Sequence, residues 1–230
     1  MSDDPLELAR SIRPQAFGDR SANHIAEPVV EPMWSGVRVI AAARDGTAAI
    51  LEDGEPFDTQ AKLIDAIGTA SAATTDGVIL DGYVTKQIAN DEPGVYTGPD
   101  PVPSTGSLIL QTFTGTRRRR DELIEDLAEE RAARYVQPED TVNLVVVDVL
   151  WLDGEWLLDV PLLERKRLLE AILPGDALVR AGTYVRPPIS TWVGSWRAQG
   201  FRGLAFKAAN SRYRPGEKTP DWATTPMPRR

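Results

Sequence analysis

Residues Asn143–Leu152, with the sequence NLVVVDVLWL, decide the fold class of this 230-residue chain. Eight of these ten residues are apolar and four of them are valines, as expected of a central strand that is covered on both faces of a sheet. The dipeptide Asp153-Gly154 follows, and such a pair favours the left-handed dihedrals of a tight hairpin. The stretch therefore predicts a buried central strand followed by a hairpin.

The segments before this strand have the pattern of an antiparallel meander. Strand-like sequence runs from Val37 to Ala43 and from Thr47 to Glu52, and Asp53-Gly54 marks the next turn. Residues 59–70 are expected to form a helix and residues 77–85 another strand.

Two helices are expected after the central strand. Residues 161–173 place a stripe of five aliphatic side chains on one helical face, with Asp159 available as a cap and Pro174-Gly175 ending the helix; the stripe is Leu162, Leu163, Leu169, Ile172 and Leu173. A second helix is expected over residues 192–199. Strands and helices in this arrangement predict an α+β fold of antiparallel β-sheets packed with helices.

The expected domain organisation is a loosely packed lead-in over residues 1–30, one domain over residues 31–225 and a tail over residues 226–230. Residues 90–107 are rich in proline and glycine and are predicted to be a surface loop or insertion. Arg117–Arg120 begins a charged amphipathic helix, and its four arginines either contact a phosphate backbone or pair with the acidic residues that follow.

Composition excludes several kinds of site. The chain has no cysteine and a single histidine, His24, so disulfides, thiolate metal sites and histidine clusters are not expected. The net charge of -8 predicts weak DNA binding or none, because that binding depends on lysine and arginine. No stretch is long and apolar enough to span a membrane, and no secretory signal is present, which predicts a cytoplasmic protein.

Four motifs are similar to those of the nucleotidyltransferase (adenylation) domain of ATP-dependent DNA ligases, whose core is ATP-grasp-like. Residues 31–38, EPMWSGVR, resemble E-P-K-W-D-G-x-R, and residues 80–84, LDGYV, resemble L-D-G-E followed by an apolar residue. Residues 147–154, VDVLWLDG, resemble F-D-x-x-x-L-D-G. Residues 202–207, RGLAFK, followed by Ser211–Gly216 and Asp221-Trp222, resemble E-G-x-x-x-K, S-x-Y-x-P-G and D-W. The motifs stand in the family's order.

The departures from these motifs fall at the positions that the resemblance assigns to chemistry. Met33 stands where the family's lysine attacks the α-phosphate of ATP, and a thioether has no nitrogen for that bond. Ser35, Tyr83 and Arg202 each replace an acidic residue, and since Mg²⁺ prefers anionic oxygen ligands, no magnesium site is expected. Thr224 and Pro226 replace the two lysines of the family's last signature, and Val147 stands where a ring often stacks on adenine.

The resemblance also identifies retained candidates for nucleotide binding. Glu31 matches a position near the adenine, and Arg38 and Lys207 match positions that contact phosphate or ribose. With Arg202 these cations either form a metal-free site for ATP or another anion, or they pair with Asp81 or Asp148 and bind nothing. No cofactor is expected beyond ATP held without covalent adenylation.

The predicted function is therefore that of a catalytically inactive DNA-ligase-like domain, which acts as a binding or regulatory protein with a protein partner in DNA repair. The aromatic residues Trp192, Trp196 and Phe201 either form the partner surface or pack inward. Ligases of this type also need an OB-fold domain of about a hundred residues after the core, and with eight residues after Trp222 none is expected. Two alternatives remain: an active ligase whose nucleophile is Lys62 or Lys86, and a metal-free binder of nucleotide or nucleic acid.

Overall fold

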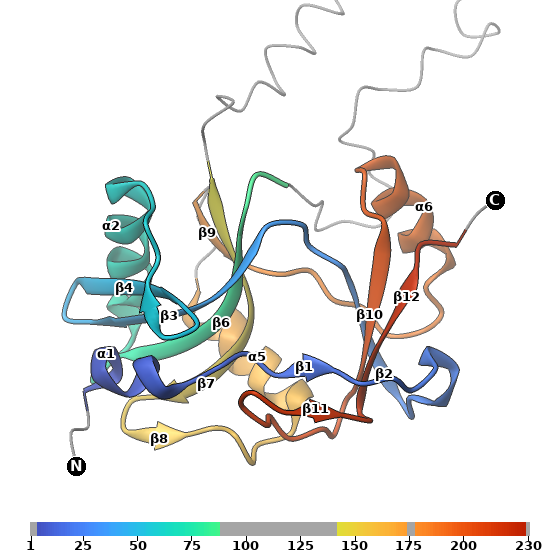
Figure 1. Ribbon diagram of the computed structural model, residues 1–230, viewed down its shortest axis with the longest axis horizontal. Coiled ribbons are helices and arrows are strands. Elements are labelled where there is room, and N and C mark those ends of the chain that lie inside the picture. The colour runs from blue at the N-terminus through green and yellow to red at the C-terminus, as the bar shows by residue number, and fades with distance from the viewer. Residues whose placement is uncertain (1–3, 88–141, 174–177, 229–230) are drawn as a thin grey trace, which may run out of the picture.

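The computed structural model describes residues 4–87, 142–173 and 178–228, which form two main sheets with helices packed against them (Figure 1). The larger sheet has the order β5-β4-β3-β6-β7-β8, with β9 paired to β7. Its strands are β3 (Val37–Arg44), β4 (Thr47–Glu52), β5 (Glu55–Pro56), β6 (Val78–Thr85), β7 (Asn143–Leu152), β8 (Glu155–Trp156) and β9 (Val179–Ala181).

The smaller main sheet has three antiparallel strands in the order β12-β10-β2. They are β2 (Pro28–Pro32), β10 (Gly203–Ala208) and β12 (Trp222–Pro226). A further pair, β1 (Ala16–Phe17) and β11 (Lys218–Thr219), is parallel, as is the pairing of β7 with β9. The expected antiparallel sheets are therefore confirmed for most strands but not for these two pairs.

Helices cover the larger sheet on one face. α2 (Ala61–Ala70), the 3-10 turn η3 (Ser71–Ala73) that follows it, and α5 (Leu162–Ile172) belong to this layer. Leu63 and Ile67 of α2 pack with Leu169 of α5 in the largest core cluster, against alternate residues of β3, β6 and β7. The helices begin within two residues of where the sequence predicts.

The other face of the larger sheet meets the N-terminal segment and the smaller sheet. The helical turns α1 (Pro5–Leu8) and η1 (Ala9–Ser11) pack beneath β3, and η2 (Ala22–His24) contacts β12. Ala9 and Ile12 are buried there with Trp151 and Trp222. The expectation of a loosely packed lead-in is therefore wrong. Tertiary contacts hold these helical turns, although the turns are too short to show a hydrophobic period in the sequence. The boundary between residues 30 and 31 stays a prediction.

α6 (Ser190–Ala198) packs against an apolar cluster between the two sheets, where Val193 and Trp196 join residues of β2 and β10 in the smaller sheet and of β7 in the larger one. Trp196 and Phe201 are 0% and 2% exposed, and Trp192 is half-buried. The aromatic residues therefore pack inward, and the alternative in which they form an exposed partner surface is contradicted.

Two further expectations concern α5. Its N-cap is Pro161, and no side chain caps the helix; Asp159 instead lies 3.6 Å from Arg214, so the predicted cap is wrong. The Pro174-Gly175 end of this helix, the 90–107 loop and the helix after Arg117–Arg120 lie outside the described residues. None of the helices in the described part of the chain has the length and apolar character needed to cross a membrane.

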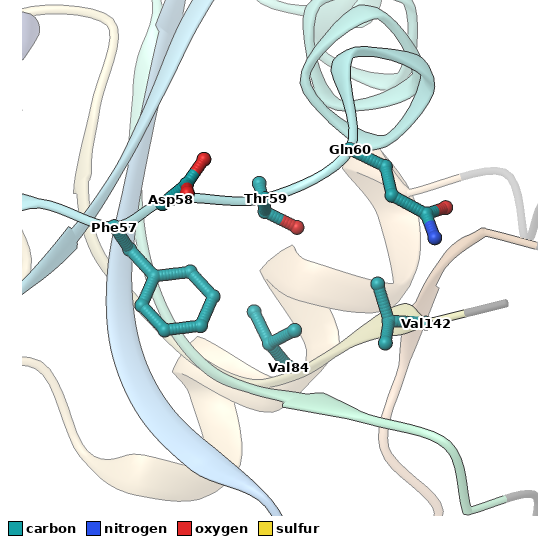
Figure 2. Close-up of a pocket in the computed structure, with 6 residues that line it drawn as sticks. All are labelled: Phe57, Asp58, Thr59, Gln60, Val84 and Val142. Carbon is teal, nitrogen blue, oxygen red and sulfur yellow. The ribbon is translucent and has the colours of Figure 1, made fainter. Parts of the chain in front are cut away.

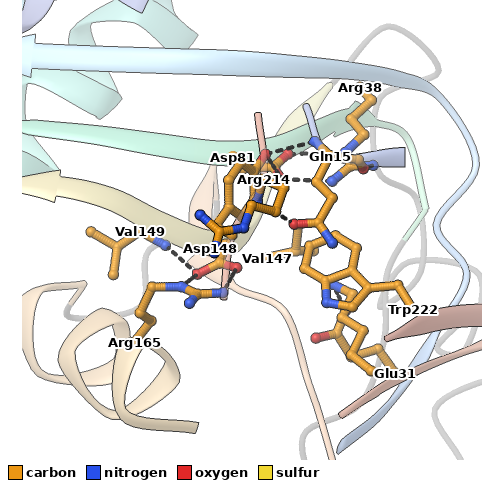
Figure 3. Close-up of polar contacts among 12 residues, drawn as sticks. Gln15, Glu31, Arg38, Asp81, Val147, Asp148, Val149, Arg165, Arg214 and Trp222 are labelled. Atoms are coloured by element: carbon orange, nitrogen blue, oxygen red, sulfur yellow. Dashed lines mark hydrogen bonds and ion pairs between the residues drawn. The ribbon is translucent and has the colours of Figure 1, made fainter. Parts of the chain in front are cut away.

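Two buried carboxylates of the larger sheet bind arginines, one from α5 and one from the neighbouring strand β3. Asp81 of β6 and Asp148 of β7 are register partners, and both are 0% exposed. Register shifts lie between Ile79 and Leu80 and between Asp81 and Gly82. Arg165 of α5 donates from Nε and Nη2 to the two oxygens of Asp148, at 2.8 and 2.9 Å (Figure 3).

Replacing Arg165 with leucine should lower the free energy of unfolding by about 3–5 kcal/mol, because Asp148 would stay buried without its cation. Arg167→Leu is the matched control: Arg167 lies on the same helix, pairs with Glu164 and has a 60% exposed side chain. Its loss should cost less than about 1 kcal/mol. Urea denaturation of both variants measures the difference, and equal losses would contradict the role of the buried pair.

Candidate functional site

Met33 lies just past the end of β2, beside the first residue of β10. Its N–H donates to the carbonyl oxygen of Gly203 at 2.9 Å. A methyl group placed on Gly203 would come within 2.8 Å of the Met33 sulfur, so the thioether lies over this glycine. The residue is 38% exposed. Solvent at this place therefore meets a side chain without a nitrogen atom.

Ser35 belongs to the same motif as Met33 and Tyr83 to the next one, and neither side chain provides a carboxylate. The Ser35 hydroxyl donates to Oε1 of Gln87 at 2.9 Å, and its N–H reaches the same oxygen at 3.0 Å. Tyr83 of β6 is the register partner of Arg38 on β3, and its ring centre lies 5.7 Å from the guanidinium carbon. Burial raises the pKa of Tyr83 to about 12, so the phenol stays protonated at neutral pH.

Arg38 is held inside the protein by a carboxylate. Its Nε and Nη2 donate to the two oxygens of Asp81 at 3.0 and 2.6 Å, and Nη1 donates to the carbonyl oxygen of Gln15 at 2.6 Å (Figure 3). Tyr213 also donates to Asp81, at 2.8 Å. Burial acts to lower the pKa of Arg38, but the paired Asp81 holds it above its usual range. The guanidinium is therefore occupied by the protein itself.

Glu31 lies between two buried lysines. Lys207 of β10 donates to Oε2 at 2.8 Å, and the Lys166 ammonium of α5 lies 2.5 Å from Oε1. Burial acts to raise the pKa of Glu31, but the two ammonium groups hold it below its usual 4.5. Glu31 and Lys207, both expected from the sequence to face a nucleotide, thus pair with each other.

Lys166 is a member of this cluster that the motif comparison missed. Its ammonium donates to the carbonyl oxygen of Val147 at 2.7 Å and lies 5.3 Å from the centre of the Tyr184 ring. The signal in the sequence was the helical period: Leu162, Arg165, Lys166 and Leu169 are spaced to share one face, and all of them are buried. The predicted stripe contained only aliphatic side chains, so it left out these two charged residues.

The cluster holds more positive than negative charge, because two ammonium groups share one carboxylate. Burial lowers the pKa of Lys207, against the opposing effect of Glu31. The Lys207 nitrogen lies 4.4 Å from the centre of the Trp222 ring, and a cation over an indole face is favourable. The indole thus provides part of the compensation that a second carboxylate would give.

The remaining positions of the motifs do not add a binding group to this cluster. Arg202 is exposed at the start of β10, and within the described residues it forms no ion pair. Thr224 and Pro226 of β12 lie opposite Ala205 and Gly203 of β10. Val147 is buried in an apolar cluster with Val145 and Trp34. Of the three cations expected to converge, Arg38 and Lys207 are paired inside and Arg202 faces solvent.

A pocket of about 370 Å³ lies elsewhere, at the N-terminus of α2 (Figure 2). It is lined by Phe57, Asp58, Thr59, Gln60, Val84 and Val142. Val84 belongs to the core on the α2 side of β6, whereas its neighbour Tyr83 packs toward the smaller sheet, because successive side chains of a strand point to opposite faces. This pocket contains none of the candidate nucleotide-binding residues.

Glu31→Gln should lower the free energy of unfolding by about 3–5 kcal/mol at pH 7, because both lysines would remain buried without an anion. The folded-state pKa of Glu31 is depressed, so its contribution is present above the unfolded value of about 4.5 and is lost as pH falls through the folded value. The difference between wild type and variant should therefore shrink at pH 3. Glu55→Gln, at an exposed position of β5, is the control in urea denaturation at both pH values; a difference independent of pH would contradict the pairing.

Comparison with known proteins gives the same family throughout. The family model of the ATP dependent DNA ligase domain matches residues 106–224. A probable DNA ligase of Streptomyces coelicolor is 28% identical over 214 residues, and a DNA ligase of Methanocorpusculum labreanum is 26% identical over 162 residues. These alignments cover 88% and 70% of this chain but only 37% and 25% of the two relatives, so the chain spans about a third or less of their length.

Solved structures share the fold. The ligase domain of M. tuberculosis LigD superposes with a TM-score of 0.61 at 21% identity, over 94% of this chain and 59% of that one. The ATP-dependent DNA ligase of bacteriophage T7, in complex with ATP, gives a TM-score of 0.50 at 15% identity, over 93% and 68%. With a family model that matches half of its residues and this shared architecture, the chain belongs to the ATP-dependent DNA ligase domain family.

Proposed function

We propose that this protein is a ligase-type adenylation domain that forms no lysyl-adenylate at residue 33 and acts as a cytoplasmic binding or regulatory protein linked to DNA repair. The observation that carries the proposal is Met33. Adenylation needs a side-chain nitrogen that attacks the α-phosphorus while pyrophosphate leaves, and methionine has none. The link to repair rests on the family and on the named activity of the relatives, which are longer proteins.

The metal chemistry of adenylation is also unsupported at this position. Mg²⁺ takes hard oxygen ligands in nearly octahedral order, and the motif positions hold Ser35, Tyr83 and Arg202. Within the described residues, no three histidine, cysteine or acidic side chains converge as a metal site would need. A phosphate chain at this place would therefore meet a phenol and an arginine instead of a bound cation.

The first alternative is an active ligase with a relocated lysine. Lys62 lies on α2, on the far face of the larger sheet from Arg38 and Tyr83, so its amine is separated from Met33 by the sheet. Lys86 directly precedes Gln87, whose side chain contacts Ser35. Of the two lysines considered, Lys86 is therefore the one that geometry favours for this alternative.

The protein should show no mass increase of one AMP after incubation with ATP and Mg²⁺ or Mn²⁺, when its intact mass is measured under denaturing conditions. Met33→Lys is the informative variant: it restores the nitrogen but not the acidic positions, so it should form little adduct, and Met33→Lys/Tyr83→Glu/Arg202→Glu should form more. An adduct on the wild-type protein that disappears in Lys86→Ala would establish the relocated lysine instead.

The second alternative is a metal-free nucleotide binder, and the ion pairs argue against it. ATP would have to replace Asp81 at Arg38 and Glu31 at Lys207. Asp81 would then stay buried without its cation, and Glu31 would keep only one of its two. This cost opposes binding by the same groups.

Millimolar ATP without metal should therefore leave the melting temperature unchanged. A ligand that binds only the folded state raises stability by RT ln(1 + [L]/Kd), so differential scanning fluorimetry over a range of ATP concentrations detects binding in this range. Sodium tripolyphosphate at matched ionic strength is the control for a general anion effect. A saturable rise specific to ATP would establish a nucleotide site.

A further inference from the structure

The charge of the chain is distributed unevenly. Residues 178–216 contain seven lysines and arginines and no aspartate or glutamate, whereas the whole chain has a net charge of -8. This segment includes α6 and the strand β10 that follows it. A basic segment in an acidic chain is a local feature that an anionic partner can recognise.

Arginines lie at both ends of α6. Arg186 is exposed four residues before the helix begins, and Arg202 is exposed four residues after it ends. Arg197 is half-buried in the last turn. Within the described residues, none of these three side chains forms an ion pair with a carboxylate. They differ in this respect from Arg38 and Arg165, which are neutralised inside.

The core beneath α6 has donors without acceptors. The indole nitrogens of Trp34 and Trp196 and Nε of Arg197 are buried, and they have no hydrogen-bond partner among the described residues. Trp34 and Trp196 are 7% and 0% exposed. The three residues are contiguous, because Trp34 packs edge-on against Phe201 at 5.0 Å and the N–H of Phe201 donates to the Trp196 carbonyl oxygen. These buried donors lie beneath the same helix as the arginines, whose charge no carboxylate of the described residues balances.

The N-terminus of α6 adds to the same potential. No side chain caps the helix, and no acidic residue stands in its first turn. The free N–H groups at a helix N-terminus favour a negative charge. Arg186 and this terminus lie at one end of the helix, and Arg197 and Arg202 at the other.

We propose that α6 and its flanking arginines bind an acidic polypeptide segment, whose carboxylates contact Arg186, Arg197 and Arg202. This inference rests on the proposed function as a binding protein and names the chemistry of its partner. Nine residues of helix span about 13 Å, which about four extended residues of a peptide cover. A segment with acidic residues about four positions apart would reach both ends of α6.

A nucleic acid is the competing anion, and the small number of available cations favours a peptide. The surface offers only three arginines within a short span, whereas nucleic acid gains its affinity by neutralising many successive phosphates.

The test is a titration of the full chain into fluorescein-labelled deca-glutamate, followed by fluorescence anisotropy at low salt. Saturable binding is expected, with a Kd that rises about five- to tenfold in Arg197→Gln/Arg202→Gln, since each exposed charge contact is weak. Arg202→Gln alone, at an exposed position, guards against loss of folding and should give a smaller change in the same direction.

Arg212→Gln is the matched control, because Arg212 is an exposed arginine of the same carboxylate-free segment. The segment between β10 and β11 to which it belongs follows the end of β10 that is opposite to α6; Figure 1 shows α6 and β11 at opposite ends of β10. Its Kd should equal that of the wild type. A loss as large as in the α6 variants would mean a general charge effect and would overturn the proposal.

Labelled oligothymidylate of ten nucleotides distinguishes the other source of negative charge. Absence of peptide binding, or tighter binding of the oligonucleotide that depends on the same arginines, would overturn the proposal. Whether these arginines bind a peptide does not affect the intact mass measured after ATP treatment. A failure of the α6 surface and a failure of the proposed function therefore give different results.

Discussion

The carboxylates of Asp81 and Asp148 are the constraint on which the rest of the structure depends. They face each other across β6 and β7 and are completely buried, where two like charges would repel strongly without compensation. Arg38 arrives from β3 and Arg165 from α5, and each binds its carboxylate through two nitrogens. Charge balance therefore fixes a neighbouring strand and a covering helix in place around the centre of the sheet.

The same constraint determines what the site can do. A guanidinium that balances a buried carboxylate is not available to a ligand unless another cation takes its place. Arg38 is in this position with Asp81, and Lys207 is in a similar one with Glu31. The candidate phosphate-binding residues thus belong to the framework of the fold, which needs them whether or not a nucleotide binds.

The four longest strands of the larger sheet could be predicted from the sequence, because their signals are local. Residues 143–152 form β7 with the expected bounds, since a continuous apolar run followed by Asp-Gly has few other structures available. Residues 37–44 and 78–85 likewise form β3 and β6. The packing of the first thirty residues could not be predicted, because α1 and η1 are too short to show a period.

The candidate site was predicted in its parts but not in its pairing. Glu31, Arg38 and Lys207 were recognised from motif positions, yet which cation meets which carboxylate depends on contacts across as many as 176 residues of sequence. Lys166 was missed because a lysine in a charged helix usually faces solvent. The burial of Lys166 follows from the helical period of α5 together with the position of Glu31 against that helix.

ATP–pyrophosphate exchange tests the central claim most directly, because it follows reversible formation of an enzyme–adenylate without needing the adduct to accumulate. With labelled pyrophosphate, ATP and Mg²⁺, the protein should incorporate no more label into ATP than a reaction without protein. Incorporation that increases with protein concentration and is lost in one lysine variant would contradict the account. It would mean that the fold of this domain still supports adenylation although residue 33 is a methionine.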